Sequence, residues 1–318
     1  MPADAPHVRL ASERIEARVA LTRTVATDGA RRGAVCAAIG RSGARRAEPG
    51  PCGPLVLEAR ADAETVELDV WGHPATPGAD VEAALRHARG WVGLDDDASG
   101  FAEVVGGHPV LGRLLVLGGG VRLSRLPRIG EAFGRAVLGQ LVQGLEQRRS
   151  IAQVAAMLGT EAPGGVWTWP TARQMGGADA WTLRGAGVSL RSARALHAAA
   201  VDDAGLTRLT GVDDWDALDR RLRAIPGCGA WTSAETRLAL GDADAVSVGD
   251  YHLPAVIGHV LGGGGRGWDD AAMLELLAPF APNRGRVIRM IEGAVARGLV
   301  SGPARRGPRR PLSAHRYW

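Results

Sequence analysis

The chain has 318 residues, with 38 basic against 34 acidic side chains and a formal net charge of +4. All of the basic residues are arginine, so no side-chain amine can form a Schiff base or serve as a P-loop lysine. Cys36, Cys52 and Cys228 are too scattered for a CxxC pair, which excludes a zinc ribbon and a four-cysteine iron–sulfur cluster. No long apolar run and no secretory-type amino terminus occur, so we expect a cytoplasmic protein that does not enter a membrane.

The first 120 residues are predicted to form a small, β-rich mixed domain. Strand patterns cover 15–24, 34–39, 55–58 and 65–71, with Gly/Pro-rich turns at 49–54 and 72–78. From Asp80 the hydrophobic period becomes helical, and short helical stretches continue to about Leu117. The glycine run at 118–120 is the expected boundary.

Residues 121–300 are predicted to be almost entirely helical. Helical patterns cover 129–142, 146–158, 189–201, 216–224, 232–240, 250–261, 273–277 and 284–297. Ser189 has the residue type of a helix N-cap. An Arg/Pro-rich tail, 301–318, ends the chain. The fold class predicted is therefore α+β, with a small β-rich domain followed by a helical one.

The segment 222–232, LRAIPGCGAWT, predicts a hairpin between two helices. Gly227 and Gly229 flank Cys228 and allow a sharp turn, and the next helix is expected to begin near Ala230. The amides of Gly227, Gly229 and Thr232 would then be donors at a helix N-terminus, which suits a phosphate. An ordinary corner between two core helices is the alternative.

Asp250 lies eighteen residues after Thr232, at a predicted helix start and next to Tyr251. A hairpin, one helix, a short loop and a lone aspartate resemble the helix–hairpin–helix (HhH-GPD) DNA glycosylase superfamily. Within it, the chain is most similar to the 3-methyladenine DNA glycosylase II (AlkA-like) branch. The segments 91–101, 132–142 and 282–287 also resemble that branch, so that the likeness covers roughly residues 80–318.

The resemblance implies a helical HhH-GPD core that binds double-stranded DNA with a damaged base. In such an enzyme Asp250 would stabilise the positive charge that builds on the sugar, or activate water. One carboxylate suffices if the leaving base is already cationic, as 3-methyladenine and 7-methylguanine are. An ordinary N-cap is the alternative role of Asp250. Because the chain lacks lysine, we expect a monofunctional enzyme without AP-lyase activity, which leaves an abasic site.

The resemblance also implies a base pocket with Trp231 and Tyr251, and His252 stands beside them. Glu235 and Glu292 occupy positions where the family has further aromatic residues. Two interpretations of these glutamates stay open. They could select cationic bases by charge in place of cation–π stacking, or they could be solvated helix faces.

Further contacts follow from the same resemblance. Gln140 and Leu141 match the loop that inserts a wedge into the gap left by a flipped base, although Leu141 could equally be a core leucine. Apart from the resemblance, Arg284 and Arg286 belong with Arg289 to a basic stripe on the last predicted helix and are expected to contact DNA, with solvation of more than one helix face as the alternative for part of the stripe. The backbone carbonyls of Arg223, Ile225 and Cys228 are implied to hold a structural monovalent cation; no other cofactor and no iron–sulfur cluster are expected.

The sequence thus predicts a monomeric, nucleoid-associated enzyme of base excision repair for alkylation damage. Two alternatives remain from the residues alone. One is a non-catalytic DNA-binding protein that keeps the hairpin. The other is a glycosylase for a deaminated or bulky lesion.

Overall fold

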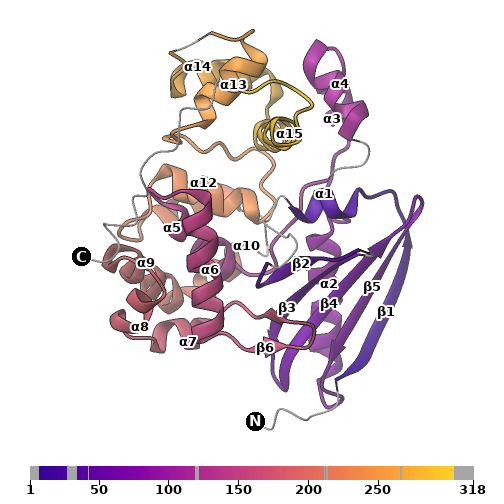
Figure 1. Cartoon of the computed structure of the whole chain (residues 1–318), viewed down its shortest axis with the longest axis vertical. Helices are drawn as coiled ribbons and strands as arrows, with labels where there is room; N and C mark the ends of the chain where they lie inside the picture. The colour runs from indigo at the N-terminus through magenta and orange to yellow at the C-terminus, as the bar shows by residue number, and fades with distance from the viewer. Residues whose placement is uncertain are drawn as a thin grey trace.

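The computed structural model describes residues 7–26, 34–41, 43–118, 122–210, 212, 214–265 and 267–303. A sheet occupies one side, a large group of helices lies beside it, and a smaller group sits above both (Figure 1). This arrangement confirms the predicted α+β class, with a β-rich part followed by a helical part. None of the described helices has the length and apolar character needed to cross a membrane. The arginines of the tail beyond 303 lie outside the described residues.

The sheet is antiparallel, with five strands in the order β1-β5-β4-β3-β2. Its strands are β1 (Val8–Glu16), β2 (Ala37–Ile39), β3 (Ala44–Gly50), β4 (Gly53–Ala61) and β5 (Thr65–Gly72). Helix α2 (Gly78–Trp91) covers one face, where Leu57 of β4 and Trp91 belong to the same core. Val56 points to the other face and packs with the short hairpin β6 (Glu161–Ala162) and β7 (Val166–Trp167). The period of two along β4 therefore divides its residues between two cores.

Two parts of the sheet region differ from the sequence prediction. The strand expected over 15–24 is wrong in its second half, because Leu21–Ala26 forms a helix, α1, whose Leu21 and Val25 are buried. Strand β3 was not predicted, since ARRAEPG lacks alternating apolar residues. Arg46 and Glu48 occupy buried positions in it because they pair with each other and with further polar partners, Glu131 for Arg46 and His87 for Glu48.

The large group of helices, α5 to α12, is called the central helices below. It comprises α5 (Ile129–Gly139), α6 (Gly144–Leu158), α7 (Ala172–Gly177), α8 (Ala180–Gly185), α9 (Leu190–Val201), α10 (Asp203–Thr210), α11 (Trp215–Arg223) and α12 (Ala230–Ala239). Residues of α5 to α11 form one hydrophobic core, which includes Phe133 of α5 and Leu218 of α11. Ser189 caps α9 as predicted, its Oγ accepting the amide of Ser192 at 3.1 Å.

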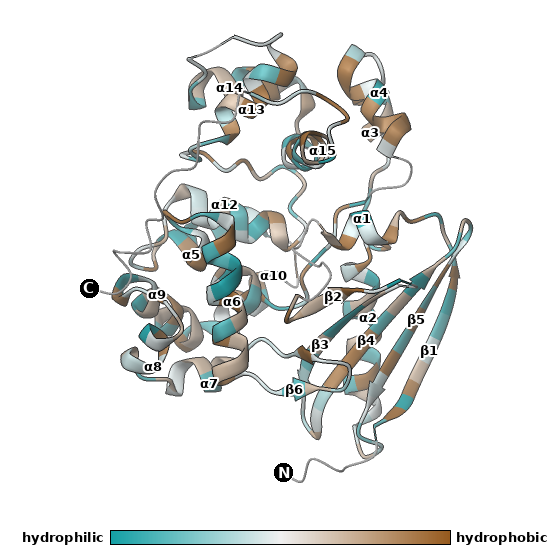
Figure 2. Ribbon diagram, viewed as in Figure 1, coloured by the Kyte–Doolittle hydropathy of each residue, from teal (hydrophilic) through white to brown (hydrophobic). Residues whose placement is uncertain are grey.

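The smaller group, called the upper helices, joins segments from distant parts of the chain. It comprises α3 (Phe101–Gly106), α4 (Pro109–Gly118), α13 (Leu253–Leu261), α14 (Asp270–Leu277), the 3-10 turn Ala278–Phe280 and α15 (Arg284–Ala296). Val105 and Leu111 share a core with Ile257 and Ile291, and much of α3 and α4 is hydrophobic (Figure 2). In space, α3 and α4 therefore lie with the last helices, while the predicted division at residue 120 stays a prediction.

Candidate active site

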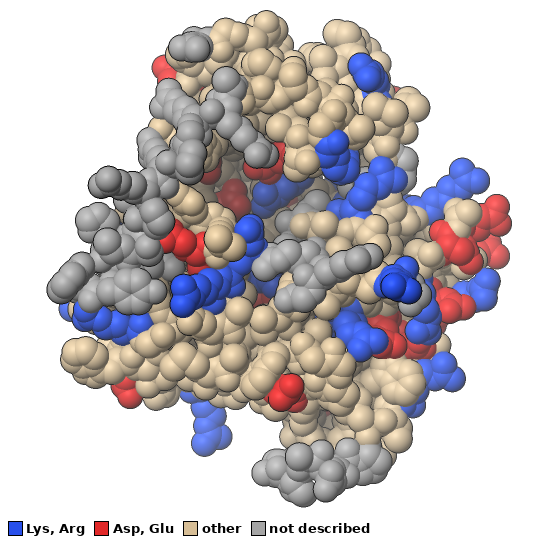
Figure 3. Space-filling view, viewed as in Figure 1, with Lys and Arg blue, Asp and Glu red and all other residues tan. Residues whose placement is uncertain are grey.

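A cleft of about 1180 Å³ is lined by the central helices and by two elements that belong to the upper helices, the loop before α13 and α15. Acidic and basic side chains surround the hollow at the middle of the molecule (Figure 3). The cleft brings together most of the residues predicted for the site, namely Gln140, Leu141, Gly227, Gly229, Trp231, Thr232, Glu235, Asp250, Tyr251 and His252.

The predicted hairpin connects α11 to α12. Gly227 has a φ of +94°, in the left-handed region that favours glycine. Cys228 is buried, and burial raises the pKa of its thiol to about 12, so this side chain is an apolar plug. The first backbone hydrogen bond of α12 runs from the amide of Ser233 to the carbonyl of Gly229 at 3.0 Å. The helix therefore leaves the amides of Ala230 to Thr232 as donors at its N-terminus.

Gln140 joins the end of α5 to this hairpin. Its Nε2 donates to the carbonyl of Gly227 at 2.9 Å and to Oγ1 of Thr232 at 2.7 Å. Leu141 follows with a φ of 57°, and 84% of it is exposed. Helix α5 ends at Gly139, three residues before the predicted end. The core-leucine interpretation of Leu141 is therefore wrong, because the side chain projects from a strained turn beside the cleft.

Asp250 is held by three N–H donors. Its Oδ1 accepts the amides of His252 at 2.7 Å and Leu253 at 2.8 Å, and its Oδ2 accepts Nε1 of Trp231 at 2.9 Å. Helix α13 begins at Leu253, not at Asp250, so the aspartate caps it from the preceding loop. The indole of Trp231 lies over Gly139, where an added Cβ would come within 3.2 Å of its ring. Capping thus uses one carboxylate oxygen while the other faces the cleft residue Trp231.

An acidic cluster lies behind Asp250. Glu235 accepts a hydrogen bond from Ser247 Oγ and pairs with Arg289 Nη2 at 3.3 Å, while Arg289 Nη1 binds Glu292 at 3.0 Å. Burial raises the pKa of Glu292; Arg289 opposes this, whereas Glu235 and Asp250 add to it. Glu235 lines the cleft, and its two partners exclude a freely solvated face. Glu292 does not line the cleft and its side chain is 43% exposed, so the predicted place in the base pocket is wrong and the solvated-face interpretation fits this glutamate.

Tyr251 and His252 are exposed where the loop enters α13. Their rings pack edge to face, with centroids 4.7 Å apart at 87°. Half of the Tyr251 surface is accessible, and both side chains line the cleft. They are therefore placed to meet a bound molecule at the rim.

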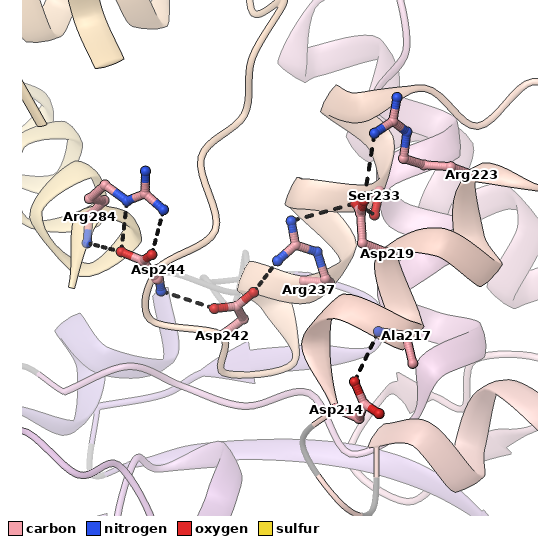
Figure 4. Close-up of polar contacts among 9 residues, drawn as sticks. All are labelled: Asp214, Ala217, Asp219, Arg223, Ser233, Arg237, Asp242, Asp244 and Arg284. Atoms are coloured by element: carbon pink, nitrogen blue, oxygen red, sulfur yellow. Dashed lines mark hydrogen bonds and ion pairs between the residues drawn. The ribbon is translucent and has the colours of Figure 1, made fainter. Parts of the chain in front are cut away.

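The two arginines predicted to bind DNA, Arg284 and Arg286, form ion pairs within the protein. Arg284 forms a double contact with Asp244, with Nε–Oδ1 at 2.9 Å and Nη2–Oδ2 at 2.5 Å (Figure 4). Arg286 is only 6% exposed, binds Asp96 through two nitrogens at 2.6 and 2.7 Å, and lies over the ring of Phe101. The expected DNA contact is wrong for Arg286, and Arg284 instead joins α15 to the loop after α12.

The rear of the hairpin is braced by a second charge network. Asp219 of α11 accepts Ser233 Oγ at 2.6 Å and lies 3.6 Å from both Arg223 and Arg237, while Arg237 also binds Asp242 (Figure 4). This network fixes α11 against α12 and so fixes the turn between them. Of the carbonyls implied to hold a cation, that of Ile225 accepts Cys228 N at 3.0 Å, and that of Arg223 lies at the end of α11. Such carbonyls suit a monovalent cation, which stays a prediction.

Sequence reasoning missed three arginines of the cleft, Arg135 of α5, Arg148 of α6 and Arg191 of α9. No motif singles them out, because their importance depends only on the tertiary position of their helices. The bond between Trp231 and Asp250 was equally invisible, although both residues were named.

The sequence matches no protein-family model and no curated protein. Solved structures are similar. A 3-methyladenine DNA glycosylase from Archaeoglobus fulgidus has a TM-score of 0.76 at 16% identity, covering 91% of this chain and 99% of the other. MBOgg1 in complex with a low-affinity DNA ligand gives 0.71 at 14%, covering 93% and 100%. The 8-oxoguanine glycosylase/lyase of Clostridium acetobutylicum with double-stranded DNA gives 0.62 at 11%, covering 82% and 97%. The chain therefore has the fold of the helix–hairpin–helix DNA glycosylases.

Proposed function

We propose that the chain is a monofunctional DNA glycosylase that flips an alkylated, cationic purine out of double-stranded DNA and hydrolyses its N-glycosidic bond. The observation that carries the proposal is the position of Asp250. Its carboxylate lies in the cleft of a glycosylase fold, oriented by Trp231 and two amides, in the same cleft as the hairpin that can bind phosphate.

In the proposed reaction the bond between C1′ and the purine nitrogen breaks, and the base leaves with the electron pair. A base that was cationic becomes neutral on leaving, so no general acid is required. Positive charge builds on the sugar and is stabilised by the Asp250 carboxylate. Water then bonds to C1′ and passes its proton to that carboxylate or to solvent, which leaves an abasic site.

Base flipping requires a contact that holds the DNA backbone and a group that fills the gap in the stack. The free amides at the start of α12 suit the first task, because they bind phosphate without reading sequence. The exposed Leu141 suits the second, since an apolar side chain offsets part of the cost of unstacking. Gln140 connects the two elements through its bonds to Gly227 and Thr232.

One observation supports alkylated purines as the lesion class, and a second supports a monofunctional enzyme. Glu235 places a carboxylate in the cleft, near Asp250, where a positive base would be favoured over a neutral one. In addition, the chain has no lysine, so it has no side-chain amine for the Schiff base of a lyase. We therefore propose a lesion such as 3-methyladenine or 7-methylguanine and base removal without strand cleavage, by a monomer that needs no catalytic cofactor.

The test uses an end-labelled duplex with one 7-methylguanine, followed by heating in alkali. The wild type should produce a break only after alkali, and Asp250→Asn should lower the single-turnover rate by roughly 10²- to 10⁴-fold. Asp179→Asn is the matched control, because Asp179 caps α8 through Thr182 N at 2.7 Å and does not line the cleft. Asparagine also caps helices, so neither change should unfold the protein.

Two outcomes would contradict the proposal. An Asp250→Asn variant as fast as the Asp179→Asn variant would remove Asp250 from the chemistry. A wild type that binds DNA but excises no base from a panel of methylated, deaminated and bulky lesions would indicate a non-catalytic DNA-binding protein.

A larger lesion is a second candidate because of the size of the cleft. Its volume of about 1180 Å³ exceeds the roughly 300–1,000 Å³ usual for small-molecule sites. The chemistry at Asp250 would be the same. Faster excision of a purine with a bulky N7 substituent than of 7-methylguanine would favour this candidate.

A further inference from the structure

Most arginines near the cleft are already paired with carboxylates. Arg284 binds Asp244, Arg286 binds Asp96, and Arg289 binds Glu235 and Glu292. On the opposite wall, Arg135 binds Glu131 at 2.7 Å. Such guanidiniums are held by the protein, so breaking their ion pairs would oppose any contact with a phosphate.

Arg148 and Arg191 are different. Both are exposed and both line the cleft, and neither forms an ion pair within the part of the chain that the structure describes. Arg191 also stands in the first turn of α9, where a positive charge meets the positive end of the helix dipole. Because this position does not stabilise the helix, we expect the guanidinium of Arg191 to serve binding and not folding.

The guanidinium of Arg191 lies against the hairpin. A Cβ added to Gly227 would be 3.5 Å from Arg191 Nε and 3.6 Å from its Cγ. A Cβ added to Gly229 would meet no atom within 4 Å, so the surface of the turn is open there. A formal positive charge thus lies against Gly227, in the turn that leads into the free amides at the start of α12. Together they offer an anion both directional donors and a cation.

The guanidinium of Arg148 points back to the start of α6. A Cβ added to Gly144, the first residue of that helix and one turn before Arg148, would be 3.3 Å from Arg148 Nη1, and Leu141 precedes Gly144 by three residues and lines the same cleft. The exposed leucine is therefore accompanied by one free cation on α6, while the other stands at the hairpin to which Gln140 is bonded.

We infer that Arg191 and Arg148 form a two-point phosphate clamp: Arg191 with the hairpin amides binds one DNA phosphate, and Arg148 beside the Leu141 turn binds another. The inference rests on the proposed DNA substrate and assigns the backbone contacts to these two arginines instead of Arg284 and Arg286. A duplex is the partner that fits, because its phosphates are regularly spaced single charges beside bases that a wedge can separate.

The test is the salt dependence of binding to a duplex with a stable abasic-site analogue, measured by fluorescence anisotropy from about 50 to 200 mM NaCl. Each phosphate contact contributes about 0.9 to the slope of log Kobs against log [NaCl]. Arg191→Gln and Arg148→Gln should each make the slope shallower by about 0.9, and the double variant by about 1.8. Arg191→Lys should restore the slope, because lysine keeps the point charge.

Arg173→Gln is the matched control. Arg173 is an exposed arginine of α7, outside the cleft and without an ion pair among the described residues. Its variant should keep the wild-type slope. An arginine whose glutamine variant has the slope of this control, with an unchanged melting temperature, is not part of the clamp.

Because the analogue has no base to remove, binding and excision are measured separately. If the arginine variants keep the slope of the control, the clamp is ruled out while the proposed excision by Asp250 still stands. An enzyme that excises nothing can still show the expected slopes, so the two proposals fail in distinguishable ways.

Discussion

The protein contains two clusters of arginine and glutamate that resemble each other in composition and differ in charge balance. In the buried cluster, Arg46 and Glu131 approach to 2.5 Å with side chains 1% and 3% exposed, and Arg135 and His87 add further partners. In the cleft cluster, Arg289 alone serves both Glu235 and Glu292, with Asp250 nearby.

The pKa shifts in the two clusters run in opposite directions. Burial raises the pKa of Glu131, but Arg46 and Arg135 outweigh it and leave the pKa lowered. The side chain of Glu292 is 43% exposed, and its pKa is raised because partial desolvation together with Glu235 and Asp250 outweighs the single Arg289. The same residue types thus hold the sheet to α5 in one place and share one arginine among several carboxylates in the other. Two of these carboxylates, Glu235 and Asp250, line the cleft where the proposed cationic base would bind.

The largest expected effect comes from breaking the buried cluster with Arg46→Met. Glu131 would lose a buried guanidinium, and such a change lowers the free energy of unfolding by about 3–5 kcal/mol. Urea denaturation followed by circular dichroism measures it. Arg46→Met with Glu131→Leu removes both charges and should be less destabilising than the single change. A single variant within 1 kcal/mol of wild type would show that the cluster does not hold the sheet to the helices.

The next effect concerns selectivity in the cleft. Glu235→Gln removes one negative charge and keeps the shape, so excision of 7-methylguanine should fall about tenfold, or roughly 1.4 kcal/mol. Excision of the neutral base hypoxanthine should be unchanged, and Glu235→Asp should recover part of the loss. Single-turnover rates on both substrates provide the measurement. Equal losses on both would contradict selection by charge.

Removing the arginine of the cleft cluster should affect stability much less. Arg289 is 22% exposed and its partners are 25% and 43% exposed, so Arg289→Met should change the free energy of unfolding by only about 0–1 kcal/mol. A loss as large as that of Arg46→Met would erase the difference between the clusters.

The smallest effects are those of pH on stability, and their signs are opposite. The lowered pKa of Glu131 gives stability that is present above its usual value of 4.5 and is lost as pH falls through the folded pKa. The raised pKa of Glu292 gives stability that is present below 4.5 and is lost as pH rises through its folded pKa. Unfolding free energies from pH 3 to 7 should therefore fall less with rising pH in Glu292→Gln than in wild type. Parallel curves would contradict the raised pKa.

Local patterns predicted the longer helices and the hairpin, but they missed the short helices α7, α8 and α10. The predicted start near Ala230 agrees with the structure, because glycine and a switch in period define that boundary. Local patterns were insufficient for β3, because its charged residues are typical of an exposed segment. Glu48 and Arg46 are buried only because their partners His87 and Glu131, 39 and 85 residues away, lie beside them in the fold. The sharing of one core by Val105 and Ile291 likewise depends on contacts that no local pattern records.

At the candidate site the sequence predicted which residues line the cleft better than it predicted which arginines are available to a ligand. Asp250, Trp231 and Gln140 meet in one cleft, as the resemblance implied. Arginines were harder, because Arg286 and Arg191 look alike in sequence. One is buried against Asp96 and the other lies at the hairpin without an ion pair among the described residues, and only the fold separates them.

The two hydrogen bonds of Gln140 have a mechanical consequence. In the proposed complex, Leu141 separates two stacked bases. Because restacking is favourable, the bases exert a force on Leu141 that tends to move its turn away from the DNA. Gln140 transmits that load to Gly227 and Thr232 at 2.9 and 2.7 Å, so the recoil is carried by the hairpin. In the proposed complex the hairpin would itself hold the backbone of the DNA, so the force on Leu141 would be returned to the duplex through the hairpin. Asp250 can then keep its alignment while the DNA is under strain.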